Sequence, residues 1–114
     1  MLLRADLYHA HIYFDAEQVA FAEALHEQAR RDLGELATIW PMRRMPVGPH
    51  EAPMFEIEFP HASREPVLAW VEAHHGPLSV LLHPETGNAL ADHRDHARWL
   101  GRQLGLKFSV LDAH

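Results

Sequence analysis

Cysteine is absent from this 114-residue sequence. The protein therefore forms neither disulfide bonds nor thiolate–metal bonds, which excludes haem-thiolate chemistry and cysteine-ligated iron–sulfur clusters. Any metal ion would have to be held by histidine, aspartate or glutamate, a donor set that suits Fe(II), Mn(II) or Zn(II). The lack of one residue type thus narrows the metal chemistry that this chain can support.

Long apolar runs are also missing, because the chain contains no uninterrupted stretch of about 20 apolar residues, the length that spans a bilayer. Residues 1–6 do not combine a charged segment with a long apolar one, so no signal peptide is predicted. Basic side chains are scarce, since 10 Lys and Arg stand against 16 Asp and Glu, a formal net charge of −6. We therefore expect a cytoplasmic protein that binds neither membranes nor nucleic acid.

Histidine is abundant, with 11 residues in a chain whose length suits a single domain over residues 1–114. Two of them, His9 and His11, lie in the apolar run Leu7–Phe14. Because side chains alternate along a strand, this run predicts a strand with His9, His11 and Tyr13 on one face. Neutral imidazoles on stiff backbone are what a transition-metal site requires.

Other periodic segments predict the rest of the fold. Met54–Phe59 alternates, with Glu56 and Glu58 on the face opposite its aromatic residues. Proline and glycine residues between positions 42 and 53 predict an irregular loop that carries His50. The other expected elements are helices that begin at the caps Asp15 and Ser63 and end before Gly34 and Gly76, a third helix from Leu90 to Leu100, and strands at Leu36–Trp40, Leu78–His83 and Leu106–Leu111.

This order of elements predicts a ferredoxin-like α+β fold, an antiparallel sheet with helices on one face and an extra C-terminal helix. Right-handed crossovers give the strand order 4-1-3-2, which makes the first strand central. Antiparallel register then places His9 beside His83 and Glu58, and His11 beside Glu56, on the uncovered face of the sheet. Histidines and carboxylates from three strands therefore converge.

Two histidines and one carboxylate on one side of a metal ion, with adjacent positions open, are typical of non-haem Fe(II) oxygenases. We expect His11, His83 and Glu56 to be metal ligands, together with His9, and His50 is a further candidate ligand. Structural alternatives stay open for each group. The two histidines of the first strand would also suit a hydrogen-bonded dimer interface, the glutamates a solvated strand face, and His50 the cap of a neighbouring turn.

Catalysis and substrate binding have their own candidates. His50 and His9 are candidate catalytic groups, because a histidine that titrates near neutral pH can take up and return protons. Arg43 and Arg44 follow the second predicted strand and can pair with a substrate carboxylate through the guanidinium fork, a solvated loop being the alternative. Tyr13 shares the face of the first two histidines and is a candidate substrate contact.

The remaining ionisable and aromatic residues have structural interpretations. Asp92–His96 opens the third predicted helix, where charged groups are usually solvated. The uncovered sheet face would carry Met54 and Leu81, and such partly apolar faces commonly become interfaces, so we expect a homodimer. Core packing is predicted for the three tryptophans, Trp40, Trp70 and Trp99.

Several segments, in this order, resemble the DOPA 4,5-dioxygenase family over nearly the whole chain. They are Tyr8–Asp15, Pro46–His50, Pro53–Glu56, Leu78–Gly87, Asp92–His93 and Ala97–Gly101. The resemblance implies a small ferredoxin-like protein that is an extradiol dioxygenase. It would open the ring of L-DOPA or a related catechol with non-haem Fe(II) and O2, and His93 is then a further candidate substrate contact. Zn(II) is an alternative metal in the purified protein.

Two other functions use the same residues. One is a cofactor-free dimeric ferredoxin-like enzyme or monooxygenase, in which the histidines act as acid/base groups without metal. The other is a non-catalytic module that binds zinc or an aromatic molecule, with the zinc in a closed histidine site. Activity without bound metal would distinguish the cofactor-free enzyme from the dioxygenase. A zinc site without an open coordination position would distinguish the non-catalytic module from it.

Overall fold

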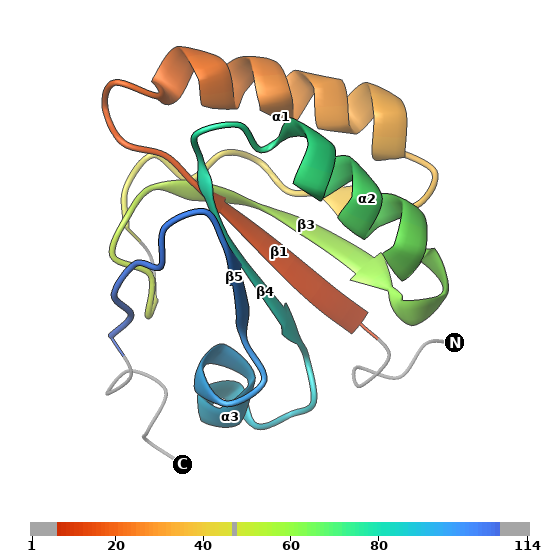
Figure 1. Ribbon diagram of the computed structural model, residues 1–114, viewed down its shortest axis with the longest axis vertical. Coiled ribbons are helices and arrows are strands. Elements are labelled where there is room, and N and C mark those ends of the chain that lie inside the picture. The colour runs from red at the N-terminus through yellow and green to blue at the C-terminus, as the bar shows by residue number, and fades with distance from the viewer. Residues whose placement is uncertain (1–6, 47, 108–114) are drawn as a thin grey trace.

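The computed structural model describes residues 7–46 and 48–107, which form one antiparallel sheet with helices on both sides (Figure 1). The strands are ordered β2-β3-β1-β4-β5 across the sheet. In this part of the chain, three α-helices, α1, α2 and α3, connect or follow the strands, and a 3-10 helix spans His61–Ser63. The bounds are Leu7–Tyr13 for β1, Val19–Leu33 for α1, Thr38–Ile39 for β2, Met54–Pro60 for β3, Arg64–His74 for α2, Ser79–Pro84 for β4, Ala89–Arg94 for α3 and Arg98–Leu100 for β5.

The predicted ferredoxin-like fold and its central first strand are confirmed. β1 pairs with β3 on one side and with β4 on the other, in the predicted antiparallel register. His9 lies opposite both Glu58 and His83, and His11 lies opposite Glu56. A fifth strand, β5, adds to the predicted order outside β4.

Helices α1 and α2 cover one face of the sheet, as predicted (Figure 1). Both helices bury an apolar stripe on that face, from Ala22 to Leu33 in α1 and from Val67 to Val71 in α2. The two helices are also joined to each other, because the Trp70 indole N–H donates to Asp32 at 2.9 Å. The core between helices and sheet consists of the alternate strand residues that point away from the histidines, such as Ala10, Ile12, Phe55, Ile57 and Val80.

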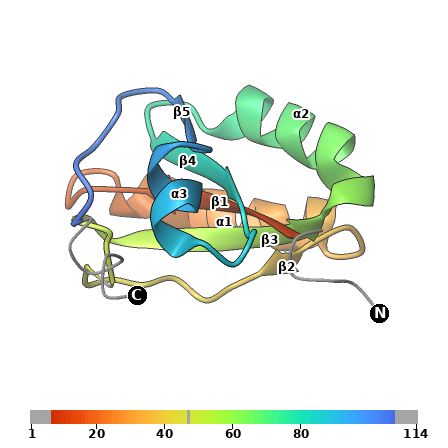
Figure 2. The same cartoon turned by 90° about the horizontal axis from the view of Figure 1, so that it is seen from below.

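The end of the chain differs from the sequence prediction. The helix expected from Leu90 to Leu100 ends at Arg94, and the residues after it return to the sheet as β5. Strand pairing supplies hydrogen bonds to the exposed edge of β4, which a longer helix would leave unpaired. In Figure 2, α3 lies on the side of the sheet opposite α1. Of the predicted strand Leu106–Leu111, Leu106 makes an isolated bridge to His50, and residues 108–111 lie outside the described part of the chain.

The face expected to be open is covered by the chain itself. Tyr13, Met54 and Leu81 are buried beneath residues 97–106, including Trp99 and Leu104. The apolar patch that suggested a homodimer is thus used within the chain, and the homodimer stays a prediction. Trp40, expected in the core, is 41% exposed. Within residues 7–46 and 48–107, no helix combines the length and apolar character needed to cross a membrane.

Candidate metal centre

A polar pocket of about 410 Å³ opens on the sheet face opposite α1 and α2. The pleat of the strands explains its composition, because the apolar residues between the histidines all point into the core. The loop before β3 contributes His50, and α3 contributes two further side chains. The polar residues that line this histidine pocket are His9, His11, His50, Glu56, His83, Glu85, Asp92 and His93.

His11 and His83 form the centre of the pocket. Their Nε2 atoms are 2.9 Å apart, and their rings are stacked with centroids 5.0 Å apart. Both side chains are buried, with 3% and 4% of their surface exposed. Because two nitrogens can share one proton but cannot both present lone pairs at this distance, something positive must lie between them.

Nδ1 of His83, the ring nitrogen that does not face His11, shows where this histidine carries its proton. Its Nδ1 donates to the Pro84 carbonyl oxygen at 2.8 Å, and a carbonyl can only accept. Burial, together with the neighbouring His93, lowers the pKa of His83 to about 3, so the ring is neutral near pH 7. A neutral ring with its proton on Nδ1 presents the lone pair of Nε2 to His11.

Nδ1 of His11, the ring nitrogen that does not face His83, lies towards the carboxylate of Glu56. Nδ1 lies 3.6 Å from Glu56 Oε1 and makes no hydrogen bond, although the side chain is buried. Burial holds the pKa of His11 well below 6.5, and burial, then the charge of Glu58, raises the pKa of Glu56 to about 7. A proton on Nδ1 of His11 would point to the Glu56 carboxylate. The Nε2 atoms of His11 and His83 would then both present lone pairs to each other, an arrangement that calls for a cation.

These observations test whether the residues fit a metal ion. Two imidazole nitrogens bound at about 2.1 Å and at roughly right angles are ~3.0 Å apart, close to the spacing of the His11 and His83 Nε2 atoms. Metal-bound histidines commonly hydrogen-bond through the other nitrogen to a carbonyl or carboxylate, the groups found behind His83 and His11. The donor set therefore fits a divalent transition metal.

His9 belongs to two groups of potential ligands. One nitrogen atom from each of His9, His11 and His83 lies within 4.8 Å of the others, and His9 forms a second such group with Glu56 and Glu58. His9 Nε2 is 3.1 Å from Glu58 Oε2 and 3.3 Å from Glu85 Oε2. His9 thus connects the imidazole cluster to a set of carboxylates at the end of β1.

His50 lies over the other side of His11, with ring centroids 4.2 Å apart. Its Nδ1 is 2.6 Å from the Tyr13 hydroxyl, and both side chains are buried. Burial, with contributions from His93 and His9, lowers the pKa of His50 to about 4, and burial raises the pKa of Tyr13. The pair is therefore a neutral imidazole hydrogen-bonded to a neutral phenol.

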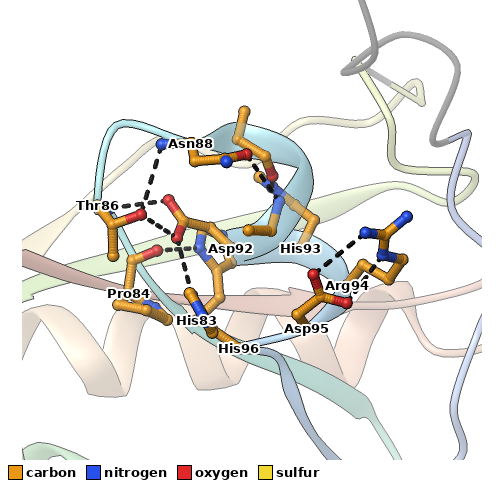
Figure 3. A network of polar contacts seen from close by, with 11 residues as sticks. His83, Pro84, Thr86, Asn88, Asp92, His93, Arg94, Asp95 and His96 are labelled. Carbon is orange, nitrogen blue, oxygen red and sulfur yellow. Dashed lines mark hydrogen bonds and ion pairs between the residues drawn. The ribbon is translucent and has the colours of Figure 1, made fainter.

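The short helix α3 brings His93 to the pocket, 4.1 Å from the ring centre of His83. Figure 3 shows how the turn before this helix is held. Asp92 accepts hydrogen bonds from the backbone N–H and the hydroxyl of Thr86, at 2.8 and 2.6 Å, and Asn88 caps the helix at 3.0 Å. Asp92, expected at a solvated helix start, is instead 2% exposed because it ties the turn to the helix.

The predicted site residues lie in four places in the structure. Tyr13 is 2% exposed and contacts His50 from beneath. Arg43 lines a second pocket, of about 380 Å³, that shares His50 and Glu56 with the first. Arg44 pairs with Glu23 of α1 at 2.7 Å and is not brought to either pocket. The predicted residues that line the histidine pocket are His9, His11, His50, Glu56, His83 and His93.

Sequence reasoning missed two pocket residues, Glu85 and Asp92. Glu85 continues the pairing of β4 through its backbone N–H, which donates to Leu7 O at 3.0 Å, so its side chain reaches His9. Its position two residues after His83 was a usable signal, because alternate residues of a strand share a face. For Asp92, no pattern in the sequence indicated the contact with Thr86.

Two curated proteins are similar to this chain over most of its length. A DOPA 4,5-dioxygenase from Amanita muscaria is 30% identical over 111 residues, which are 91% of this chain and 49% of that protein. An uncharacterized 21.2 kDa protein from Botryotinia fuckeliana is 36% identical over 114 residues, 93% of this chain and 62% of that protein. The chain thus spans between about half and three fifths of the length of these curated relatives.

A solved structure has a similar fold. The crystal structure of a candidate dioxygenase from Nostoc punctiforme superposes with a TM-score of 0.86 at 32% sequence identity, covering 96% of this chain and 93% of that one. The model of the Dopa 4,5-dioxygenase family matches residues 8–110, a range that includes every histidine of the pocket. The chain therefore belongs to the DOPA 4,5-dioxygenase family.

Proposed function

We propose that this protein is an extradiol dioxygenase that uses non-haem Fe(II) and O2 to open the ring of L-DOPA or a related catechol. The observation that carries the proposal is the buried pair of Nε2 atoms of His11 and His83, which lie 2.9 Å apart and can hold either a shared proton or a metal ion, with a nitrogen of His9 close to both. Family membership supports a dioxygenase reaction at that cation. Zn(II) is the alternative occupant in protein purified without added iron.

His9, His11 and His83 are the proposed ligands, because this group contains the facing Nε2 atoms of His11 and His83, whereas His11, His50 and His93 form a second compact group in which His50 is paired with Tyr13. Glu56 faces the outer nitrogen of His11, so we assign it the role of orienting that ring and increasing its basicity. This differs from the sequence expectation that Glu56 binds the metal directly. Bound Fe(II) would supply a chelation site for the two catechol oxygens and the electron chemistry that dioxygen requires.

The proposed reaction adds both atoms of O2 to the substrate. One ring bond breaks, between a hydroxylated carbon and its non-hydroxylated neighbour, and the product carries a carboxylate and an aldehyde. Oxidation of the ring is balanced by reduction of O2, so no further reductant is consumed. The protein must accept a proton from the catechol and return one later in the reaction.

His50 and Tyr13 suit this proton transfer. The Tyr13 hydroxyl can donate to His50 Nδ1 or accept from it, because a hydroxyl rotates and serves as both donor and acceptor. The outer nitrogen of His50 is accordingly a donor in one arrangement and an acceptor in the other. His50 is therefore the proposed acid/base group, and His9 is the second candidate in the case that His11 and His83 hold the metal without it.

The proposal predicts that His11→Ala and His83→Ala abolish Fe(II)-dependent catechol cleavage, because each removes a metal donor. Protein purified without a histidine tag would be loaded with Fe(II) anaerobically, mixed with catechols in air and followed by the absorbance of the yellow semialdehyde. Metal content would be measured in parallel, and circular dichroism would show whether the fold is retained. His61→Ala is the matched control, since His61 is an exposed histidine outside the pocket.

The outcomes separate this proposal from its rivals. Full activity of wild-type protein freed of metal would favour the cofactor-free enzyme. A structural zinc module would lose stability on His11→Ala and would cleave no catechol even when it is loaded with Fe(II). Wild-type turnover by both pocket variants would exclude His11 and His83 as ligands.

A further inference from the structure

A second pocket adjoins the histidine pocket and shares two of its walls, His50 and Glu56. The second pocket measures about 380 Å³, and Trp40, 41% exposed, and Met54 form apolar parts of its lining. A catechol ring held beside the histidines would therefore have space for a ring substituent in this second pocket. The two pockets are therefore adjacent.

Arg43 is the basic residue of the second pocket, which also contains the acidic Glu56. Among residues 7–46 and 48–107, no other lysine or arginine lines either of these two pockets. Its guanidinium makes no hydrogen bond or ion pair with the residues that the structure describes, whereas the neighbouring Arg44 is paired with Glu23 on α1. An unpaired guanidinium beside an aromatic wall is a binding site for a carboxylate, which it contacts through two parallel N–H groups.

The backbone of Arg43 is firmly placed. Its N–H donates to Met54 O at 2.8 Å, and the Met54 N–H donates to Arg43 O at 3.0 Å. This bridge attaches Arg43 to the start of β3, two residues before Glu56. Arg43 lines the second pocket together with His50 and Glu56, the two residues that line both pockets, so it lies where a ring substituent of a bound catechol can reach it.

We propose that Arg43 is the residue that determines substrate specificity, by binding an anionic substituent on the side chain of the catechol. This inference rests on the proposed catechol dioxygenase function. It excludes Arg44 from the site and predicts that the enzyme prefers catechols with a carboxylate over catechols with a neutral or cationic side chain.

The test compares three probes of similar size: 3,4-dihydroxyphenylacetate, 4-methylcatechol and dopamine, which are anionic, neutral and cationic. Arg43→Gln should lower kcat/KM for 3,4-dihydroxyphenylacetate by about 10- to 100-fold, mainly through KM, since a charged hydrogen bond is lost. Turnover of 4-methylcatechol should change less than about twofold, because that substrate never contacts the guanidinium. Arg44→Gln, the matched control, should resemble the wild type with all three probes.

Charge reversal makes the test stricter. Arg43→Glu should shift the preference towards dopamine, because the new carboxylate attracts its ammonium group. Equal losses with all three probes, or the same loss in Arg44→Gln, would overturn the role of Arg43. Wild-type cleavage with no dependence on substrate charge would overturn it as well, while leaving the dioxygenase proposal intact.

A binding measurement separates this inference from the proposed function. Isothermal titration calorimetry with Zn(II)-loaded protein measures the affinity for 3,4-dihydroxyphenylacetate without turnover. Arg43→Gln should weaken this binding by the same factor as it raises KM, and it should leave 4-methylcatechol binding unchanged. If no catechol is cleaved by the Fe(II)-loaded wild type, the dioxygenase proposal fails, and the titration decides on Arg43 by itself.

Discussion

Tyr13 shows how a single buried residue can act on the pocket without lining it. Its hydroxyl is 2.6 Å from His50 Nδ1, while its ring stacks on Trp99 with centroids 5.7 Å apart. The sequence placed Tyr13 on the face of the histidines and suggested contact with the substrate. Tyr13 is buried beneath the C-terminal segment, a place that suits a residue that positions His50, and its contact with the substrate stays a prediction.

Tyr13→Phe should lower kcat by about five- to tenfold, since the variant loses one hydrogen bond of ~1 kcal/mol that orients His50. KM and metal content should stay the same, because neither the metal donors nor the substrate contacts change. Steady-state kinetics and metal analysis would measure these quantities. Tyr8→Phe is the control, as Tyr8 bonds to His61 at the exposed surface; an equal effect in both variants would contradict the role of Tyr13.

At the scale of the element, α3 is unusual because it is only six residues long. Helices shorter than about 12 residues are marginal in isolation, so contacts outside the helix must stabilise it. The cap at Asn88 and the two hydrogen bonds from Thr86 to Asp92 provide them. The position of His93 over His83 therefore depends on a buried aspartate one residue away.

Asp92→Asn should decrease the free energy of unfolding by about 1–3 kcal/mol, because an amide N–H₂ would face a Thr86 donor in a buried place. Displacement of α3 should also raise KM, while the metal content stays near that of the wild type. Urea unfolding and steady-state kinetics would measure both effects. Asp95→Asn, at an exposed position of the same helix end, should change the free energy of unfolding much less; similar losses in both variants would disprove the special role of Asp92.

At the scale of the whole molecule, the sheet separates two environments. One face carries the apolar core, and the other buries neutral imidazoles of His11, His50 and His83. An unfolded chain would protonate these histidines near pH 6.5, whereas the folded protein holds their pKa values lower, to about 4 for His50 and about 3 for His83. Stability of the metal-free protein is therefore linked to pH.

The sign follows from which state binds more protons. As pH falls from 6.5 towards 4, three histidines take up protons in the unfolded chain but stay neutral in the folded protein. Stability therefore decreases by about 1.4 kcal/mol per pH unit for each proton that only the unfolded chain binds. Glu56 offsets part of this loss of stability. Its raised pKa of about 7 makes the folded state bind one proton at a pH above 4.5, where the unfolded chain does not bind it. The net effect is a loss of stability on acidification.

Urea midpoints of EDTA-treated protein at pH 7, 6 and 5 would measure this loss. His83→Gln should flatten the dependence on pH, since it removes one buried imidazole, whereas His61→Gln at the surface should keep the wild-type slope. A midpoint that stays constant between pH 7 and 5 would contradict the buried neutral histidines.

Much of the site was predictable from strand periodicity. The alternation in Leu7–Phe14 and Met54–Phe59 separates core residues from polar ones, and antiparallel pairing then places His9 beside His83 and His11 beside Glu56. The position of His50 was less predictable, because its loop is held by Tyr13 and by a bridge to Leu106, both distant in the sequence. Local patterns carry no information about such long-range contacts.

The sequence by itself determined the sheet, the faces of its strands and the donor types available to a metal ion. These properties follow from side-chain alternation and from the absence of cysteine. Only the tertiary structure decided which nitrogen of each histidine faces its neighbour, that Arg43 and not Arg44 lines a pocket, and that the C-terminal segment covers Met54 and Leu81. Such details depend on the path of loops and on buried hydrogen bonds, which form only when distant parts of the chain pack together.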